Sequence, residues 1–144
     1  MPINKKAATE LEKTMEVFVK DHNLHPPKCI SDKAELYIRY IFYKLRTEPV
    51  IRMGDYGIGT REEWRDKDLV DDAEALAINF MKQVRGTELV GNMSPRTTAT
   101  SLVYIACTMR GLWSMSQVEI CDYVAASEAT LRKNYKIYRK VLQV

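Results

Sequence analysis

The sequence predicts an all-α domain, and three observations lead to that prediction. Apolar residues recur with the 3.6-residue period of a helix in six segments, and no segment alternates in the way typical of a strand. Prolines and glycines fall between these segments, and Ser or Thr stands where several of them would begin. With 144 residues, of which 46% are hydrophobic, the chain can bury one core of ordinary size.

A proline pair separates the first two predicted helices. Residues 7–22 carry apolar side chains at helical spacing, and the pair Pro26-Pro27 cannot continue a helix. We therefore predict that residues 1–31 form an N-terminal helix and a proline-containing linker. Ser31 precedes the next apolar stripe and is predicted to cap a helix over residues 32–46.

The stretch 47–70 is the least regular part of the chain. Gly54, Gly57 and Gly59 fall within six residues, and a charged segment follows them. Thr60 and a glutamate three residues later have the spacing of a capping box, which begins a helical turn. We therefore expect a long loop inserted at 47–70, with one short helical turn after Thr60.

Four more helices are predicted in the second half of the chain, over 71–87, 95–109, 117–124 and 128–142. Ser94, Ser116 and Ser127 stand at the positions of their N-caps, and Pro95 occupies a first helical position. The helix over 95–109 contains several small residues, which allow neighbouring helices to approach closely. We therefore expect that helix at the centre of the domain.

Positive charge is concentrated in the last predicted helix. The chain carries a net charge of +3, whereas residues 125–144 alone carry five Lys or Arg and one acid, which gives them +4 and leaves −1 for the rest. A short helix, a tight turn and this longer basic helix form a helix-turn-helix pattern. The pattern indicates DNA binding. The structural alternative is a solvated surface whose charge complements the helix dipole.

Other classes of protein find less support in the sequence. No apolar run has the length that a membrane span needs, and three cysteines without Cys-x-x-Cys spacing suit a reducing, intracellular compartment. The two histidines lie near the N-terminus, so no Ser/His/Asp arrangement is evident. His22, His25 and Cys29 could supply three zinc ligands, but no fourth ligand is apparent. We therefore expect no enzyme, no catalytic residue, no metal and no cofactor.

Residues Gly91 to Leu142 carry several spaced motifs in a defined order. They are Gly91, Ser94-Pro95, Tyr104-Ile105-Ala106, Ser116-Gln117-Val118-Glu119-Ile120 and Thr130-Leu131-Arg132-Lys133-Asn134-Tyr135-Lys136. This arrangement resembles the C-terminal cyclin-like repeat of transcription factor IIB and its archaeal equivalents. The resemblance covers about 71–142, and reaches back to residue 32 if the helix over 32–46 is the first of the repeat.

The resemblance implies a fold and a function. The fold would be a cyclin-like five-helix domain over residues 32–144, with an extra N-terminal helix and a C-terminal helix-turn-helix. The function would be transcription initiation, by binding promoter DNA next to the TATA element and the TATA-binding protein, with RNA polymerase as downstream partner. The compartment would be the nucleus in a eukaryote, or the cytoplasm or nucleoid for an archaeal or viral source.

The chain departs from the family pattern in several ways. The arginine that usually precedes the Ser/Thr-Pro motif is absent, and Asn92-Met93 stands there. The sequence contains one full repeat and no zinc ribbon, and the insertion at 47–70 is not typical of the family. Two alternatives stay open: a cyclin-box module that binds a kinase or another protein complex without touching DNA, and a free-standing helix-turn-helix regulator that dimerises on a palindrome.

The resemblance also assigns roles to residues of the last helix. Ala129 and Arg132 correspond to positions that contact bases, with Ser127 and Thr130 close to the DNA backbone. The Arg132 guanidinium suits the O6 and N7 atoms of guanine. The remaining basic residues are expected to contact phosphates or protein. The predicted DNA-binding residues are therefore Ser127, Ala129, Thr130, Arg132, Lys133, Lys136, Arg139 and Lys140.

Overall fold

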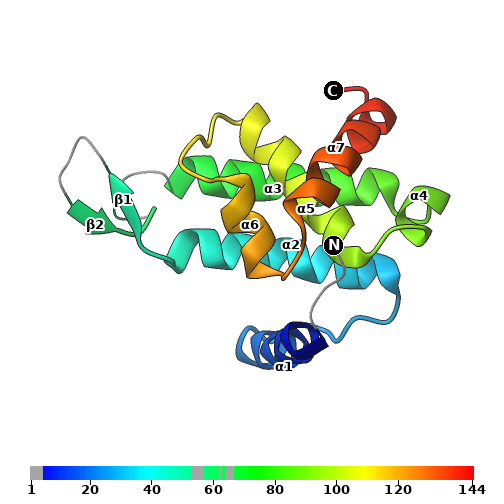
Figure 1. Cartoon of the computed structure of the whole chain (residues 1–144), viewed down its shortest axis with the longest axis horizontal. Helices are drawn as coiled ribbons and strands as arrows, with labels where there is room; N and C mark the ends of the chain where they lie inside the picture. The colour runs from blue at the N-terminus through cyan, green and yellow to red at the C-terminus, as the bar shows by residue number, and fades with distance from the viewer. Residues whose placement is uncertain (1–4, 53–56, 62, 64–66) are drawn as a thin grey trace.

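The computed structural model describes residues 5–52, 57–61, 63 and 67–144, which form seven α-helices and one β-hairpin (Figure 1). The helices are α1 (Lys5–Asp21), α2 (Ile30–Thr47), α3 (Lys67–Val84), α4 (Glu88–Gly91), α5 (Pro95–Met109), α6 (Gln117–Tyr123) and α7 (Glu128–Leu142). The strands are β1 (Val50–Arg52) and β2 (Gly57–Gly59). The prediction of an essentially helical fold is confirmed, with a two-stranded hairpin as its exception.

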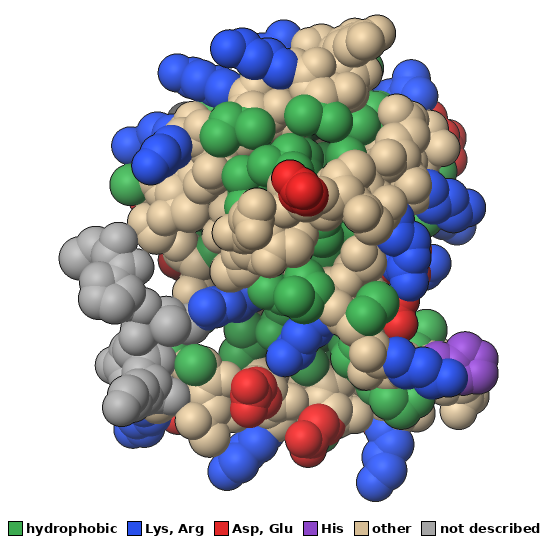
Figure 2. All heavy atoms as spheres, turned by 90° about the vertical axis from the view of Figure 1, so that its right-hand side faces the viewer, with side chains coloured by type: hydrophobic (Ala, Val, Ile, Leu, Met, Phe, Trp, Pro, Cys, Tyr) green, Lys and Arg blue, Asp and Glu red, His purple; other side chains and the backbone are tan. Residues whose placement is uncertain are grey.

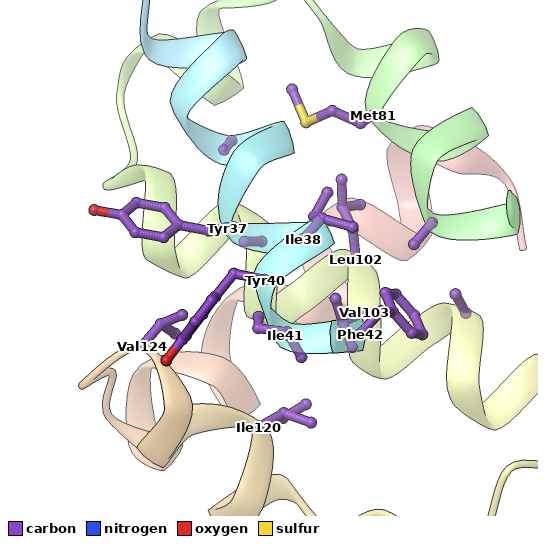
Figure 3. Packing of buried hydrophobic residues seen from close by; sticks show 14 of the residues in the cluster. Tyr37, Ile38, Tyr40, Ile41, Phe42, Met81, Leu102, Val103, Ile120 and Val124 are labelled. Atoms are coloured by element: carbon purple, nitrogen blue, oxygen red, sulfur yellow. The ribbon is translucent and has the colours of Figure 1, made fainter. Parts of the chain in front are cut away.

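Helix α5 lies at the centre of the bundle, as predicted for residues 95–109. Helices α2, α3, α6 and α7 all pack against it. Ala99 and Ala106 are fully buried on α5, and their small side chains let the neighbouring helices come close. Figure 3 shows Leu102 and Val103 of α5 beside the apolar side chains of α2, with Met81 of α3 on the other side of α2 from Ile120 of α6.

Helix α1 lies at the edge of the bundle, beside α2 (Figure 1). Its Leu11, Met15 and Phe18 side chains are buried and belong to the same apolar core as those of α2. The Phe18 ring meets the Tyr40 ring edge-on, with 5.3 Å between centroids. The division of the chain at residue 31 stays a prediction.

Three predicted helix caps are confirmed and one is wrong. Ser94, Ser116 and Ser127 each accept a hydrogen bond from the backbone N–H three residues later. Ser31 is not the N-cap of α2, because the Cys29 Sγ atom accepts the hydrogen bond from the Asp32 N–H. The Asp32 carboxylate in turn accepts from the Lys28 N–H at 3.1 Å. These two bonds begin the helix two residues earlier than predicted.

The predicted helix over 71–87 is displaced toward the N-terminus. It begins at Lys67 and ends at Val84, because Gly86 adopts a left-handed conformation with φ of 81°. The chain then forms the four-residue helix α4, which the sequence analysis did not predict. The Thr87 hydroxyl donates to the Val84 carbonyl at 2.7 Å and closes the turn between the two helices.

The expectation that residues 47–70 lack strands is wrong. Strands β1 and β2 pair antiparallel, with Val50 opposite Gly59. Three-residue strands with glycine at both ends of the second give no detectable alternation, which explains the error. The predicted capping box is present, since the Thr60 N–H donates to the Glu63 carboxylate at 3.1 Å and the Glu63 N–H to the Thr60 hydroxyl at 3.3 Å. Gly54 and half of the charged segment 61–68, namely residues 62 and 64–66, lie outside the described residues.

Candidate nucleic-acid interface

Helices α6 and α7 form a helix-turn-helix whose turn is held from two sides. Ala125 takes a left-handed conformation with φ of 51°, which reverses the chain after α6. The Ala126 N–H donates to the Cys121 carbonyl at 2.9 Å, and Arg96 of α5 donates to the Ala125 carbonyl at 3.3 Å. The turn is therefore fixed both to α6 and to the central helix.

One face of α7 packs on the core. Leu131, Tyr138 and Leu142 are buried there, and Tyr135 is partly buried against Tyr104, with 5.0 Å between ring centroids. The Tyr138 hydroxyl lies 2.7 Å from the Thr98 hydroxyl on α5, and burial raises the pKa of Tyr138. These contacts fix the direction of α7 without using its outer face.

The outer face of α7 is basic. Lys133, Lys136, Arg139 and Lys140 are all exposed there, as is Ala129, whereas Ser127 and Thr130 are partly exposed. Figure 2 shows Lys and Arg side chains gathered along the top of the molecule, at the level where α7 ends in Figure 1. In the described part of the chain, none of the three lysines forms an ion pair. Their ammonium groups are free to meet anionic groups of a partner.

Arg132 is engaged within the helix-turn-helix itself. Its Nε atom donates to the Gln117 side chain at 3.2 Å, and its Nη2 atom donates to the Glu128 carboxylate at 3.1 Å. The bond to Gln117 joins the start of α6 to α7, whereas the bond to Glu128 lies within α7. The Arg132 side chain is nevertheless 61% exposed, so these bonds are open to exchange with a partner. The i, i+4 spacing of Glu128 and Arg132 indicates their contact, whereas the contact with Gln117 depends on the fold.

A family model for the transcription factor TFIIB repeat matches residues 66–141. The match covers more than half of the chain and contains α3 to α6 and all of α7 except its last residue. The chain belongs to the TFIIB repeat family. Comparison with curated proteins and with solved structures gives no match.

Membership in the TFIIB repeat family confirms the predicted cyclin-like fold and a role as a transcription factor, with partners in the transcription machinery. The TFIIB repeat is a transcription-factor domain and not an enzymatic family. The matched range begins just before α3, so the match does not include α2. In the structure, α2 nevertheless packs against α5 and α3 of the repeat.

A buried arginine holds α6 of this TFIIB repeat in place. The Arg61 side chain is 0% exposed and pairs with Glu119 of α6, with 2.8 Å between Nη2 and Oε1. It also donates to the Leu45 carbonyl and the Ser114 carbonyl, both at 2.9 Å. The Tyr123 hydroxyl donates to the same carboxylate. Burial is the larger cause that raises the pKa of Tyr123, and this hydrogen bond is the second.

Arg61 is not among the residues predicted from the sequence, because its partner Glu119 lies 58 positions away. Glu119 itself was named only as part of a family motif. The signal that could have drawn attention to Arg61 is its place beside the predicted capping box of Thr60, which fixes the backbone at that point.

The weaker candidate groups occupy ordinary structural positions. The His22 ring lies against Phe18 and Tyr43, with centroid distances of 4.4 Å and 4.9 Å, and Cys29 caps α2. Among the described residues, no three His, Cys, Asp or Glu side chains are grouped to hold a metal ion. No described helix is both long enough and apolar enough to cross a membrane.

Proposed function

We propose that this TFIIB repeat binds promoter DNA next to the TATA element through the outer face of α7. The observation that supports the proposal is the cluster of exposed cations on α7, within the helix-turn-helix of a transcription-factor family. Duplex DNA attracts such a surface, because each neutralised phosphate releases bound counterions. Packing of the opposite face on α5 leaves the cations free for this role.

The two ends of α7 would contact DNA in different ways. Ser127, Thr130 and the first backbone N–H groups lie where a phosphate or sugar would meet the start of the helix. Lys133, Lys136, Arg139 and Lys140 neutralise phosphates along the groove. Ala129 offers a methyl group, which suits the methyl group of thymine.

Arg132 would read a base by exchanging its present partners. Its guanidinium donates to Gln117 and Glu128 in the free protein, and the same donors suit guanine O6 and N7. The nearby Glu128 carboxylate repels phosphates, so it limits how closely the backbone can approach this end of α7. Arg132 therefore contributes to specificity more than to overall affinity.

The proposed partners follow from the family. We propose that the TATA-binding protein on DNA is the first partner and that RNA polymerase joins later, in the nucleus if the source is eukaryotic. A gel-shift on TATA-containing DNA, with and without the TATA-binding protein, tests this proposal. A shifted complex that needs both proteins supports it, whereas the absence of any complex favours the cyclin-box module that binds protein alone.

A further inference from the structure

A furrow runs along the outer face of α2, away from the helix-turn-helix. Three adjoining cavities of about 440, 370 and 390 Å³ form it, and Arg39 lines all three. Helix α2 forms the floor, the linker and the end of α1 form one wall, and α3 forms the other. The side chains that line it include Phe18, His22, Leu24, Tyr43 and Ile78.

Ion pairs close both ends of the furrow. Arg85, the residue directly after α3, pairs with Asp32 at one end. Arg46 pairs with Asp71 at 2.9 Å and with Glu74 at 2.8 Å at the other end. Asp32 and Arg46 are 14 positions apart on α2, which at 1.5 Å per residue gives a length of about 21 Å. A helix of about fourteen residues has the same length.

Arg39 lies in the middle of the furrow and is the arginine there without a partner. It is partly buried, and it has no hydrogen bond or ion pair within the part of the chain that the structure describes. Arg46 and Arg85, in contrast, are both paired with carboxylates. The planar guanidinium of arginine has five donors and matches a carboxylate with two parallel bonds. Arg39 is therefore suited to a carboxylate brought by a ligand.

The walls of the furrow suit apolar side chains on either side of that carboxylate. Phe18 and Tyr43 lie with ring centroids 5.4 Å apart, and the His22 ring packs against both. Contacts within this group hold the rings in place, so the wall is preorganised. Ile78 and Leu24 add aliphatic surface on the two sides.

Nucleic acid is a poorer ligand for this surface. The furrow is also lined by carboxylates, namely Asp32, Glu35, Asp71 and Glu74. A nucleic-acid strand along this furrow of about 21 Å would bring several phosphates against these carboxylates, which would repel them. A segment with one acidic group and apolar neighbours meets that repulsion at one point only, where the Arg39 guanidinium offsets it.

We propose that this furrow binds a helical segment of a partner protein, with one carboxylate on Arg39 and apolar side chains against the aromatic and α3 walls. This mode is that of an amphipathic helix lying in a groove. It is independent of DNA binding, since the furrow contains no residue of α6 or α7.

The test uses two phage-displayed libraries of fourteen-residue peptides. One library fixes a central glutamate and randomises the flanking positions, and the other fixes glutamine in its place. We expect the full chain to enrich binders from the glutamate library. Arg39→Gln should weaken these binders by about tenfold to a hundredfold, the range for a lost hydrogen bond to a charged group. Lys33→Gln, on the same helix but outside the furrow, is the matched control and should leave binding unchanged.

Three results would overturn the proposal. They are no enrichment from either library, equal binding of glutamate and glutamine peptides, or equal binding to wild type and Arg39→Gln. We expect a labelled single-stranded oligonucleotide not to displace the bound peptide from the wild-type chain. If the oligonucleotide binds, and Arg39→Gln abolishes its binding, nucleic acid is the ligand of the furrow instead. Unchanged DNA binding by Arg39→Gln, and unchanged peptide binding by Lys136→Ala, would separate this proposal from the one for α7.

Discussion

Replacing Arg61 by methionine removes the buried guanidinium that joins the insertion to α6. Arg61 is fully buried and donates to the Glu119 carboxylate and to the Leu45 and Ser114 carbonyls. The methionine side chain is unbranched, like the aliphatic part of arginine, but it has no hydrogen-bond donor. It therefore fills much of the space and leaves these acceptors without a partner.

The expected cost follows from the burial of the pair. Removing one member of a buried ion pair costs about 3–5 kcal/mol, because the other charge stays behind uncompensated. The Glu119 side chain is 20% exposed, so water can reach it and the loss should lie near the lower limit. We expect the free energy of unfolding to fall by about 3 kcal/mol, equivalent to a fall in Tm of about 6–12 °C.

Urea denaturation followed by far-UV circular dichroism measures this loss. The set of proteins is wild type, Arg61→Met, Glu119→Gln and the double variant, with Arg110→Met as an exposed control. The double variant should lose less stability than the two single losses added together, since neither charge is then left alone. A loss below about 1 kcal/mol for Arg61→Met, or simple additivity, would show that the Arg61–Glu119 pair does not stabilise the fold in this way.

Three further predictions concern the fold. Ala106→Leu should overpack the centre of the bundle and lower the free energy of unfolding by about 1–3 kcal/mol, measured in urea. Gly86→Ala should cost about 1 kcal/mol in the same assay although nothing lies within 4 Å of the added methyl group, because its φ is +81°. Burial raises the pKa of Cys107 and Cys121 to about 12, so at pH 8 a thiol reagent should label Cys29 quickly and these two only after unfolding. Neutral stability of either variant, or fast labelling of all three thiols, would contradict the corresponding prediction.

Much of the fold could be predicted because its signals are local. Ser94, Ser116 and Ser127 are N-caps whose partners lie three residues away, and the apolar period of α5 and α7 follows from their own sequences. The hairpin could not be predicted, because a three-residue strand has too few positions to alternate. The predicted start of α2 was wrong because cysteine is rarely an N-cap, whereas serine, which stands nearby at Ser31, is a common one.

Some features of the candidate site could likewise be predicted from the sequence, and others could not. The exposure of Lys136 and Lys140 follows from their position one hundred or more degrees around the helix from Leu131, which is a property of the sequence. The engagement of Arg132 by Gln117, and the partnership of Arg61 with Glu119, depend on contacts between segments far apart in the chain. Only the folded structure brings these residues together.

The dependence of DNA binding on salt tests the role of α7 most directly. Fluorescence anisotropy on a TATA-containing duplex, with the TATA-binding protein present and between 50 and 200 mM salt, gives the slope of log K against log salt. We expect contacts of this chain with about three to five phosphates to contribute about −3 to −4.5 to this slope. Lys136→Ala should reduce the steepness by about one unit, whereas Lys20→Ala, exposed on α1, should leave it unchanged. A slope that Lys136→Ala does not alter, or equal loss with Lys20→Ala, would contradict the claim that α7 is the DNA-binding helix.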